Sequence, residues 1–160
     1  MIGNDVVDLN LAKSQSNWRR PNYLQKIFTK DEQHYILASD NPDVAVWTLW
    51  SRKEAAYKIL NRLEGVRKYN PQSYNCCGEG LLLDYIHYYD QKYFTKTFVG
   101  DDFVHSVAVE NAAHLSKIIE IEKGQVIKKN LLPFYLEYNK LLPASVTHHG
   151  KFYFAVAIKS

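Results

Sequence analysis

The sequence predicts an α+β protein in which an antiparallel sheet packs against one long central helix. The stretch from Asp43 to Leu63 has the apolar spacing of a long amphipathic helix, whereas most of the chain after Tyr69 is rich in β-branched and aromatic residues. The 160 residues fit a single domain, residues 1–160, whose core needs no disulfide. A hydrophobic content of 46%, with 14% aromatic residues, excludes wholesale disorder.

The chain begins with a predicted strand from Met1 to Leu9, where valines and leucine alternate weakly with polar residues. Pro21 interrupts the next stretch, and the segment from Asn22 to Ser39 is predicted to be helical. Within it, Thr29 and Glu32 have the spacing of a capping box, which indicates a second helix start. The sequence therefore predicts a strand followed by short helices before the central helix.

The central helix is predicted to open at Asn41 to Asp43 and to end near Gly65. At about 100° per residue, one of its faces forms an apolar stripe. This stripe consists of Val46, Leu49, Trp50, Tyr57 and Leu60. Glu54 and Lys58 lie one turn apart on its flank, so both side chains can reach one ligand at the edge of the core.

The second half of the chain contains the predicted sheet. Its strand candidates are separated by short polar connections. They are Gly80 to Tyr89, Tyr93 to Val99, Phe103 to Glu110, Lys117 to Glu122, Pro133 to Tyr138 and Lys151 to Lys159. The last of them is apolar on both faces, as expected for a central strand. Ser145 to Gly150 is predicted to be the turn that precedes it.

Asp5, Glu54 and Lys58 form the candidate reactive group. Two carboxylates suit a hard divalent cation such as Mg²⁺, and a lysine suits phosphate oxygens. If the first strand brings Asp5 to the flank of the central helix, the three side chains have what a pyrophosphate and its metal require. The sequence therefore predicts phosphoryl-group chemistry.

Each of these residues also has an ordinary structural interpretation. Glu54 and Lys58 alone would be read as a surface ion pair, and Asp5 as a residue that caps a turn. His148 alone would be read as a loop residue that forms a hydrogen bond. Only the joint occurrence of these residues favours a functional site.

Composition and charge restrict the possible partners. The net charge is +3, and Arg19, Arg20 and Lys26 cluster early in the chain, where they could steer an acidic partner. The two cysteines, Cys76 and Cys77, are adjacent and too few for a zinc site, so we expect both to be reduced. No apolar run approaches the roughly 20 residues of a membrane span, so a cytoplasmic location is expected. No stacking motif typical of nucleic-acid binding is present.

Three segments resemble the 4′-phosphopantetheinyl transferase superfamily. Ile2 to Leu9 is similar to its opening Gly-x-Asp strand, and Trp50 to Lys58 matches its Trp/Phe-x-x-Lys-Glu-x-x-x-Lys helix. Ser145 to His148 is similar to its Ser-x-Ser/Thr-His turn. The order of the three motifs resembles the single-module type, holo-acyl-carrier-protein synthase, most closely.

The resemblance implies Mg²⁺-dependent transfer of 4′-phosphopantetheine from coenzyme A to a serine of an acyl carrier protein, with release of adenosine 3′,5′-bisphosphate. Asp5 and Glu54 would hold Mg²⁺, and Lys58 would contact the phosphates. Ser145 and His148 would bind the 3′-phosphate of coenzyme A. Glu54 is the expected proton acceptor, although Asp5 or a metal-bound water could serve. The alternative is a catalytically weak module that only binds coenzyme A or the carrier.

The resemblance also implies how the site is assembled. A homotrimer is expected, with Ser145 and His148 supplied by a neighbouring subunit, although a monomer is possible. The acidic carrier protein would dock on Arg19, Arg20 and Lys26, and fatty acid biosynthesis is the expected pathway, with polyketide and peptide synthesis left open. The stretch between Lys58 and Ser145 is longer than in compact members, and Asp8 is expected to point away from Asp5.

Overall fold

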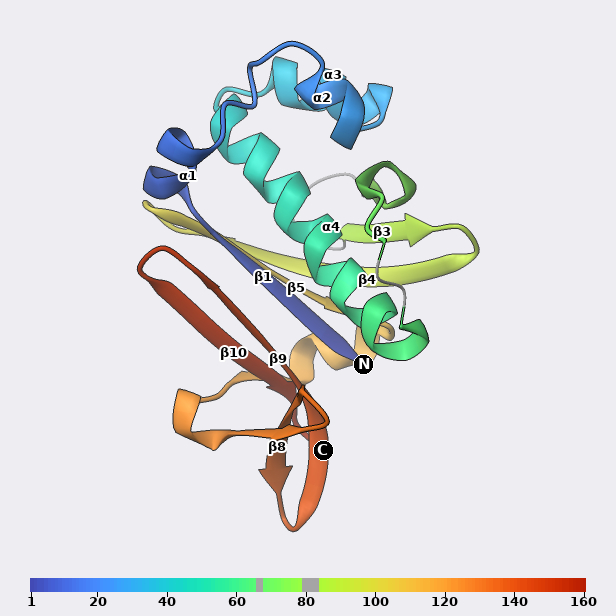
Figure 1. Cartoon of the computed structure of the whole chain (residues 1–160). Coiled ribbons are helices and arrows are strands. Elements are labelled where there is room, and N and C mark those ends of the chain that lie inside the picture. Colours follow the sequence, from blue (N-terminus) through green and yellow to red (C-terminus); the bar gives the residue numbers. More distant parts are fainter. Residues whose placement is uncertain (66–67, 79–83) are drawn as a thin grey trace.

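The computed structural model describes residues 1–65, 68–78 and 84–160. Two five-stranded antiparallel sheets carry the fold, and the longest helix, α4 (Pro42–Glu64), lies across the first of them (Figure 1). The predicted α+β class, with a sheet packed against a long helix, is confirmed. The strands nevertheless form two sheets, whereas the sequence predicted one.

Besides α4, the helices are short. They are α1 (Leu9–Gln15), α2 (Tyr23–Ile27), α3 (Lys30–Ala38) and the 3₁₀ segments η1 (Pro71–Ser73), η2 (Ala112–Lys117) and η3 (Lys123–Gln125). Helix α3 begins with the predicted capping box, in which Thr29 Oγ1 accepts from Glu32 N and Glu32 Oε2 accepts from Thr29 N. In the described part of the chain, no helix combines the length and apolarity that crossing a bilayer requires.

The first sheet has the order β1-β5-β4-β3-β2 and the second the order β6-β10-β9-β8-β7. The strands of the first are β1 (Ile2–Asp8), β2 (Asn75–Cys77), β3 (Asp84–Tyr88), β4 (Gln91–Val99) and β5 (Phe103–Val109). The strands of the second are β6 (Ile118–Glu120), β7 (Val126–Lys129), β8 (Leu132–Glu137), β9 (Lys140–His149) and β10 (Phe152–Ile158). β10 lies inside its sheet, between β6 and β9, as its two apolar faces predicted.

Helix α4 begins and ends as its sequence predicted. Asn41 Oδ1 accepts a hydrogen bond from Val44 N at 3.2 Å, and Pro42 occupies the first turn, where a missing N–H costs nothing. Gly65 ends the helix with φ of +67°, a left-handed conformation that glycine adopts without strain. The buried face of α4 packs on β1 and β5.

Gly3 sets the distance between β1 and α4. A Cβ at this position would lie 2.1 Å from the carbonyl oxygen of Ala55, far inside van der Waals contact. The missing side chain therefore allows the backbone of α4 to approach β1 closely. As a result, Asp5, two residues further along β1, lies beside Lys58 of the helix. The distance from Lys58 Nζ to Asp5 Oδ1 is 3.3 Å.

Side chains of β9 cover the free edge of β1. One edge of β1 pairs with β5, and three backbone N–H groups on the other edge donate to side chains of β9. These bonds join Asn4 N to Ser145 Oγ (2.9 Å), Val6 N to Thr147 Oγ1 (3.2 Å) and Asp8 N to His149 Nδ1 (2.8 Å). An edge strand that would otherwise expose unpaired donors is thereby satisfied inside the chain.

Two local predictions were wrong. Ser145 to His149 belongs to strand β9 instead of a turn, and the turn follows at Gly150. Helix α1 was not expected, because its start was read as the end of the first strand. The predicted strand from Gly80 to Tyr89 is confirmed from Asp84 onward, and its residues 80–83 lie outside the described residues.

Candidate functional site

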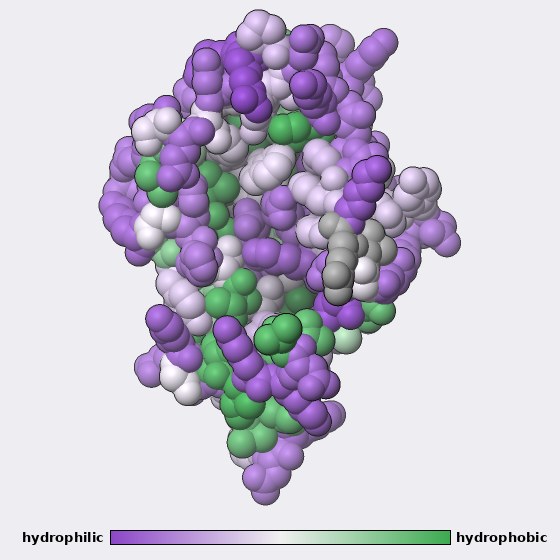
Figure 2. Space-filling model, in the orientation of Figure 1, coloured by the Kyte–Doolittle hydropathy of each residue, from purple (hydrophilic) through white to green (hydrophobic). Residues whose placement is uncertain are grey.

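A cleft of about 470 Å³, here named the wide cleft, opens between α4, β1, the end of β9 and the α1–α2 region. Asp5 and Glu54 line it from β1 and α4, and His148 lines it from β9. Its other walls include Gln15, Arg20, Tyr23, Trp47, Trp50 and His149. Figure 2 shows hydrophilic side chains in the hollowed middle of this face, with apolar side chains below them.

Lys58 and Asp5 are in direct contact. Lys58 Nζ donates to Asp5 Oδ1 at 3.3 Å and to the Asn4 carbonyl oxygen at 2.7 Å. Thr147 Oγ1 lies 3.4 Å from the same carboxylate oxygen, to which it donates. The Asp5 carboxylate is therefore held from two sides, by α4 and by β9.

The two carboxylates of the site are unfavourable to ionise in the absence of a cation. Burial raises the pKa of Asp5 above its ordinary value, although the Lys58 ammonium opposes this shift. Burial and the neighbouring Asp5 charge raise the pKa of Glu54 to about 7, again against the effect of Lys58. The single positive charge of Lys58 therefore does not neutralise both half-buried carboxylates, whereas a divalent cation would.

The donor set fits Mg²⁺. In the described parts of the chain, no three His, Cys, Asp or Glu side chains gather into a closed metal site. Asp5 and Glu54 offer hard oxygen ligands, and Mg²⁺ is usually bound by one or two carboxylates together with waters and substrate phosphates. Asp5 and Glu54 are the residues that would hold it.

A smaller hollow of about 220 Å³, here named the narrow hollow, continues along α4 and β9 beyond Lys58. Lys58 and Ser145 line it. Its remaining walls are Ile2, Tyr57, Asn61, Arg62, Leu132, Pro133, Ala144 and Val146. The five predicted site residues are therefore divided between two adjoining hollows.

Ser145 and His148 have different surroundings. His148 is exposed on the wide cleft. Ser145 is buried, with 5% exposure, and its hydroxyl accepts the hydrogen bond from Asn4 N. Because the two residues are three positions apart in a strand, their side chains leave opposite faces of β9.

Thr147 and His149 also contribute to the site, although the motif analysis predicted no role for Thr147 and defined none for His149. His149 Nδ1 accepts from Asp8 N, so the ring proton is on Nε2, 3.3 Å from Gln15 Oε1. Ser145, Thr147 and His149 occupy alternate positions, and this period of two is the sequence signal that could have predicted a strand here.

Lys53 lies within the helix motif but outside the site. Its side chain is fully buried, and Nζ donates to Glu32 Oε2 at 2.8 Å and to the Pro71 carbonyl oxygen at 3.0 Å. Glu32 Oε1 accepts in turn from Cys76 N. Lys53 therefore joins α4 to α3 and to the segment before β2.

The Asp8 carboxylate binds backbone donors outside the Asp5 site. It caps α1 by accepting from Asn10 N at 3.1 Å and Leu11 N at 3.0 Å, and it also accepts from Lys151 N. Asp8 therefore fixes the β1–α1 connection and the β9–β10 turn.

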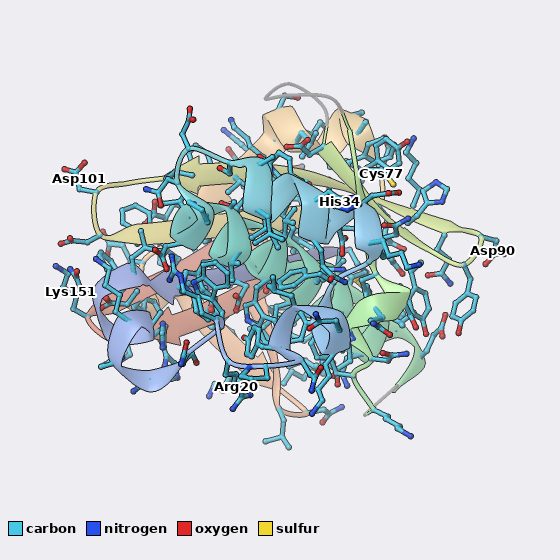
Figure 3. All side chains as sticks on the ribbon, turned by 90° about the horizontal axis from the view of Figure 1, so that it is seen from above. Arg20, His34, Cys77, Asp90, Asp101 and Lys151 are labelled. Atoms are coloured by element: carbon cyan, nitrogen blue, oxygen red, sulfur yellow. The ribbon has the colours of Figure 1, made fainter. Side chains whose placement is uncertain are left out.

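The basic residues near α1 and α2 differ in availability. Arg19 forms a two-pronged ion pair with Asp43, at 2.9 and 3.1 Å, and stacks on Trp18. Arg20 lines the wide cleft and lies over the ring of Tyr23. In the view from above, Arg20 projects well away from His34 and Cys77 (Figure 3). Arg20 and the exposed Lys26 are the better candidates for an acidic partner.

Comparisons with solved structures agree with this fold. Holo-[acyl-carrier-protein] synthase from Helicobacter pylori, solved in complex with coenzyme A, has a TM-score of 0.57 at 14% identity and covers 69% of this chain and 100% of its own. The Neisseria meningitidis synthase has a TM-score of 0.55 at 17% identity, covering 69% and 96%. The Thermotoga maritima synthase has a TM-score of 0.52 at 12% identity, covering 88% and 83%.

Sequence comparison supports the same family. No curated protein sequence matches the chain significantly. The sequence model of the 4′-phosphopantetheinyl transferase superfamily matches residues 1–107, which include the β1 and α4 motifs. Two thirds of the chain thus match, and the chain belongs to the 4′-phosphopantetheinyl transferase superfamily.

Proposed function

We propose that this protein transfers the 4′-phosphopantetheine group from coenzyme A to a serine of an acyl carrier protein, in an Mg²⁺-dependent reaction that releases adenosine 3′,5′-bisphosphate. The observation that carries this proposal is the contact of Lys58 with Asp5 at the seam of β1 and α4, where Glu54 lines the same cleft as Asp5 and lies within reach of both charges. Family membership supports the reaction class, and the coenzyme A complex of the H. pylori relative supports the donor.

The residues have separate tasks in the proposed reaction. The carrier serine oxygen bonds to the β-phosphorus, and the bond to the α-phosphate oxygen breaks. Lys58 stabilises negative charge on the phosphate oxygens, and Glu54 accepts the serine proton directly or through water. When bound between Asp5 and Glu54, Mg²⁺ would neutralise the pyrophosphate.

Binding of the 3′-phosphate is assigned to His148, because it is exposed on the wide cleft. Arg20, on the same cleft, is a second candidate cation. The buried Ser145 would support this phosphate only indirectly, through the closure of β1. Since one chain already brings His148 to the cleft of Asp5 and Glu54, a neighbouring subunit is not needed for this contact. The homotrimer stays a prediction.

Mass spectrometry tests the proposed function. An apo acyl carrier protein incubated with the protein, coenzyme A and Mg²⁺ should gain the mass of one phosphopantetheine group, and the gain should vanish with a chelator. A carrier that stays unmodified while coenzyme A binds would instead support the alternative, a binding module without transfer activity.

A further inference from the structure

The ring of Tyr69 covers the turn of α4 that carries Glu54. Trp50, Glu54 and Tyr57 lie on one side of this helix, because Glu54 and Tyr57 follow Trp50 by four and seven residues. The Tyr69 ring meets that of Trp50 edge-on, with centroids 5.9 Å apart, and that of Tyr57 at 4.6 Å. A ring that contacts both of these residues lies over the stretch of helix between them, where Glu54 stands.

The backbone that presents Tyr69 is fixed from inside the protein. Lys53, the neighbour of Glu54 in the sequence, donates from Nζ to the Pro71 carbonyl oxygen at 3.0 Å and to the Tyr74 carbonyl oxygen. The Tyr74 ring packs against that of Tyr69, with centroids 5.6 Å apart. Tyr69 is therefore held by α4 on one side and by the segment before β2 on the other.

The Tyr69 hydroxyl is buried and has no hydrogen-bond partner among the described residues. Burying a hydroxyl without a partner costs free energy, because the group loses its hydrogen bonds to water. Phenylalanine would fill the same space between the aromatic rings without this cost. Packing therefore does not account for the hydroxyl, and an acceptor has to be sought beside it.

The Glu54 carboxylate is an acceptor that lacks a donor. Asp5 accepts from Lys58 and Thr147, whereas Glu54 accepts no hydrogen bond within the described part of the chain. Burial raises the pKa of Tyr69 far above its ordinary value, and the charge of Glu54 raises it further. The hydroxyl therefore keeps its proton, and the charged group that acts on it most strongly is Glu54.

We propose that the Tyr69 hydroxyl donates a hydrogen bond to the Glu54 carboxylate when this carboxylate holds Mg²⁺. The bond forms by rotation of the Glu54 side chain and needs no movement of α4. Hydrogen bonds to a carboxylate ligand orient it and tighten the binding of the metal. Tyr69 is not among the residues that line the wide cleft, so it is a positioning residue that acts through Glu54. This inference rests on the proposed function and its metal assignment.

Metal binding by Tyr69→Phe tests the inference. This variant keeps the ring and loses only the hydroxyl, so the dissociation constant of Mn²⁺, a hard cation in place of Mg²⁺ that is followed by EPR, should rise about tenfold. The Mg²⁺ concentration that gives half the maximal transfer rate should rise by a similar factor. Without metal, Tyr69→Phe should melt no lower than the wild type, because the unpaired hydroxyl is gone.

Tyr88→Phe is the matched control. It removes a hydroxyl from the same group of rings, since Tyr88 stacks on Tyr74, but its own neighbours are Tyr89 and Glu64 instead of Glu54. Its dissociation constant for Mn²⁺ should stay within about twofold of the wild-type value. A wild-type constant in Tyr69→Phe as well would overturn the inference, while the metal assignment would stand.

A second measurement does not depend on the folding of Tyr69→Phe. In wild-type protein isotopically labelled at the tyrosine Cζ carbon, Mg²⁺ should shift the NMR signal of Tyr69, and the shift should be absent in Glu54→Gln. No shift in a wild type that binds the metal would overturn the inference alone. A shift with adenosine 3′,5′-bisphosphate but not with Mg²⁺ would also overturn it, because the hydroxyl would then serve the nucleotide. A wild type that binds neither Mn²⁺ nor Mg²⁺ would overturn the metal assignment of the proposed function as well.

Discussion

Glu54 shows how a single residue acquires its chemistry from its neighbours. It stands on a regular helix, yet burial and the charge of Asp5 raise its pKa to about 7. Lys58 compensates only in part, because it also binds Asp5 and the Asn4 carbonyl oxygen. The site thus holds excess negative charge, which is the physical reason to expect a divalent cation.

Removing either charge should stop the reaction without unfolding the protein. Glu54→Gln keeps the shape of the side chain and its helix propensity but lacks the ligand charge, so the rate of transfer to a carrier should fall at least about 100-fold. Asp5→Asn should have a similar effect. Asp101→Asn, an exposed carboxylate in the connection between β4 and β5 (Figure 3), is the matched control and should transfer normally. Near wild-type turnover of both site variants at saturating Mg²⁺ would contradict the metal assignment.

The raised pKa of Glu54 predicts how stability responds to pH. Because its folded pKa, about 7, exceeds the ordinary value of 4.5, the folded protein holds this proton more tightly than the unfolded chain. The resulting stabilisation is full below pH 4.5 and is lost as the pH rises to 7. Without metal, the melting temperature of the wild type should therefore fall between pH 5 and 8 relative to that of Glu54→Gln.

Magnesium supplies the control for this pH effect. Protons and Mg²⁺ compete for Glu54, so Mg²⁺ should bind more tightly at pH 8 than at pH 6, and saturating Mg²⁺ should remove most of the difference in melting temperature. If the difference in melting temperature between the wild type and Glu54→Gln were the same with and without Mg²⁺, the cation would not bind the Glu54 carboxylate.

At the scale of elements, the contact between β1 and α4 depends on Gly3. In Gly3→Ala, the new Cβ would meet the Ala55 carbonyl oxygen, so the helix must move away from Asp5. We expect a loss of about 1–3 kcal/mol in the free energy of unfolding, measured in urea, together with a strong loss of activity. Gly124→Ala, where nothing lies within 4 Å of the added Cβ, is the control and should change little. Unchanged activity of Gly3→Ala would mean that the helix tolerates the shift.

The acidic carrier should dock beside α2. Reversing Arg20 and Lys26 to Glu should raise the KM for the carrier by roughly tenfold, more strongly at low salt, and the Arg20 reversal should also weaken coenzyme A binding, because Arg20 lines the wide cleft. Lys92→Glu, a charge reversal on β4, should leave it unchanged. Arg19→Glu should instead lower stability, because Arg19 binds Asp43. If neither the Arg20 nor the Lys26 reversal changes the KM for the carrier, the docking surface lies elsewhere. The basic residues Lys128 and Lys129 on β7 are then the next candidates.

The elements differ in how far their sequence predicts them. Helix α4 has local signals at both ends, Pro42 and Gly65, and a regular apolar stripe. The sequence did not predict this part of strand β9, because Ser145, Thr147 and His149 are polar residues of the kind found in turns. Their side chains face β1 and accept hydrogen bonds from its N–H groups. Because β1 is far away in the sequence, the local pattern could not indicate this partner.

At the scale of the whole molecule, the two sheets are joined through β1, β9 and the end of α4. The side-chain bonds from β9 to β1 and the Arg62 contacts with β8 and β9 cross between them. The sequence could predict Asp5, Glu54 and Lys58 from motif spacing, but it could not predict Thr147, which meets Asp5 across 142 positions.

These connections predict that residues 1–160 unfold as one domain. The three tryptophans, Trp18, Trp47 and Trp50, report on the helical side, whereas hydrogen exchange of peptides from β10 reports on the second sheet. The midpoints of urea unfolding from these two probes should coincide. Arg62→Met should lower both midpoints together. Two separate midpoints in the wild type would instead divide the chain into two folding units.

The closure of β1 by β9 has a consequence for protein synthesis. Residues 4 and 145 are joined although 141 positions separate them, so β1 leaves the ribosome long before the strand that covers its edge has been made. Until the β9–β10 hairpin emerges, the nascent chain carries Asp5 without its Thr147 partner and with an open strand edge. Synthesis of the β9–β10 hairpin, more than that of β1 or α4, sets the moment at which these contacts of the site are complete.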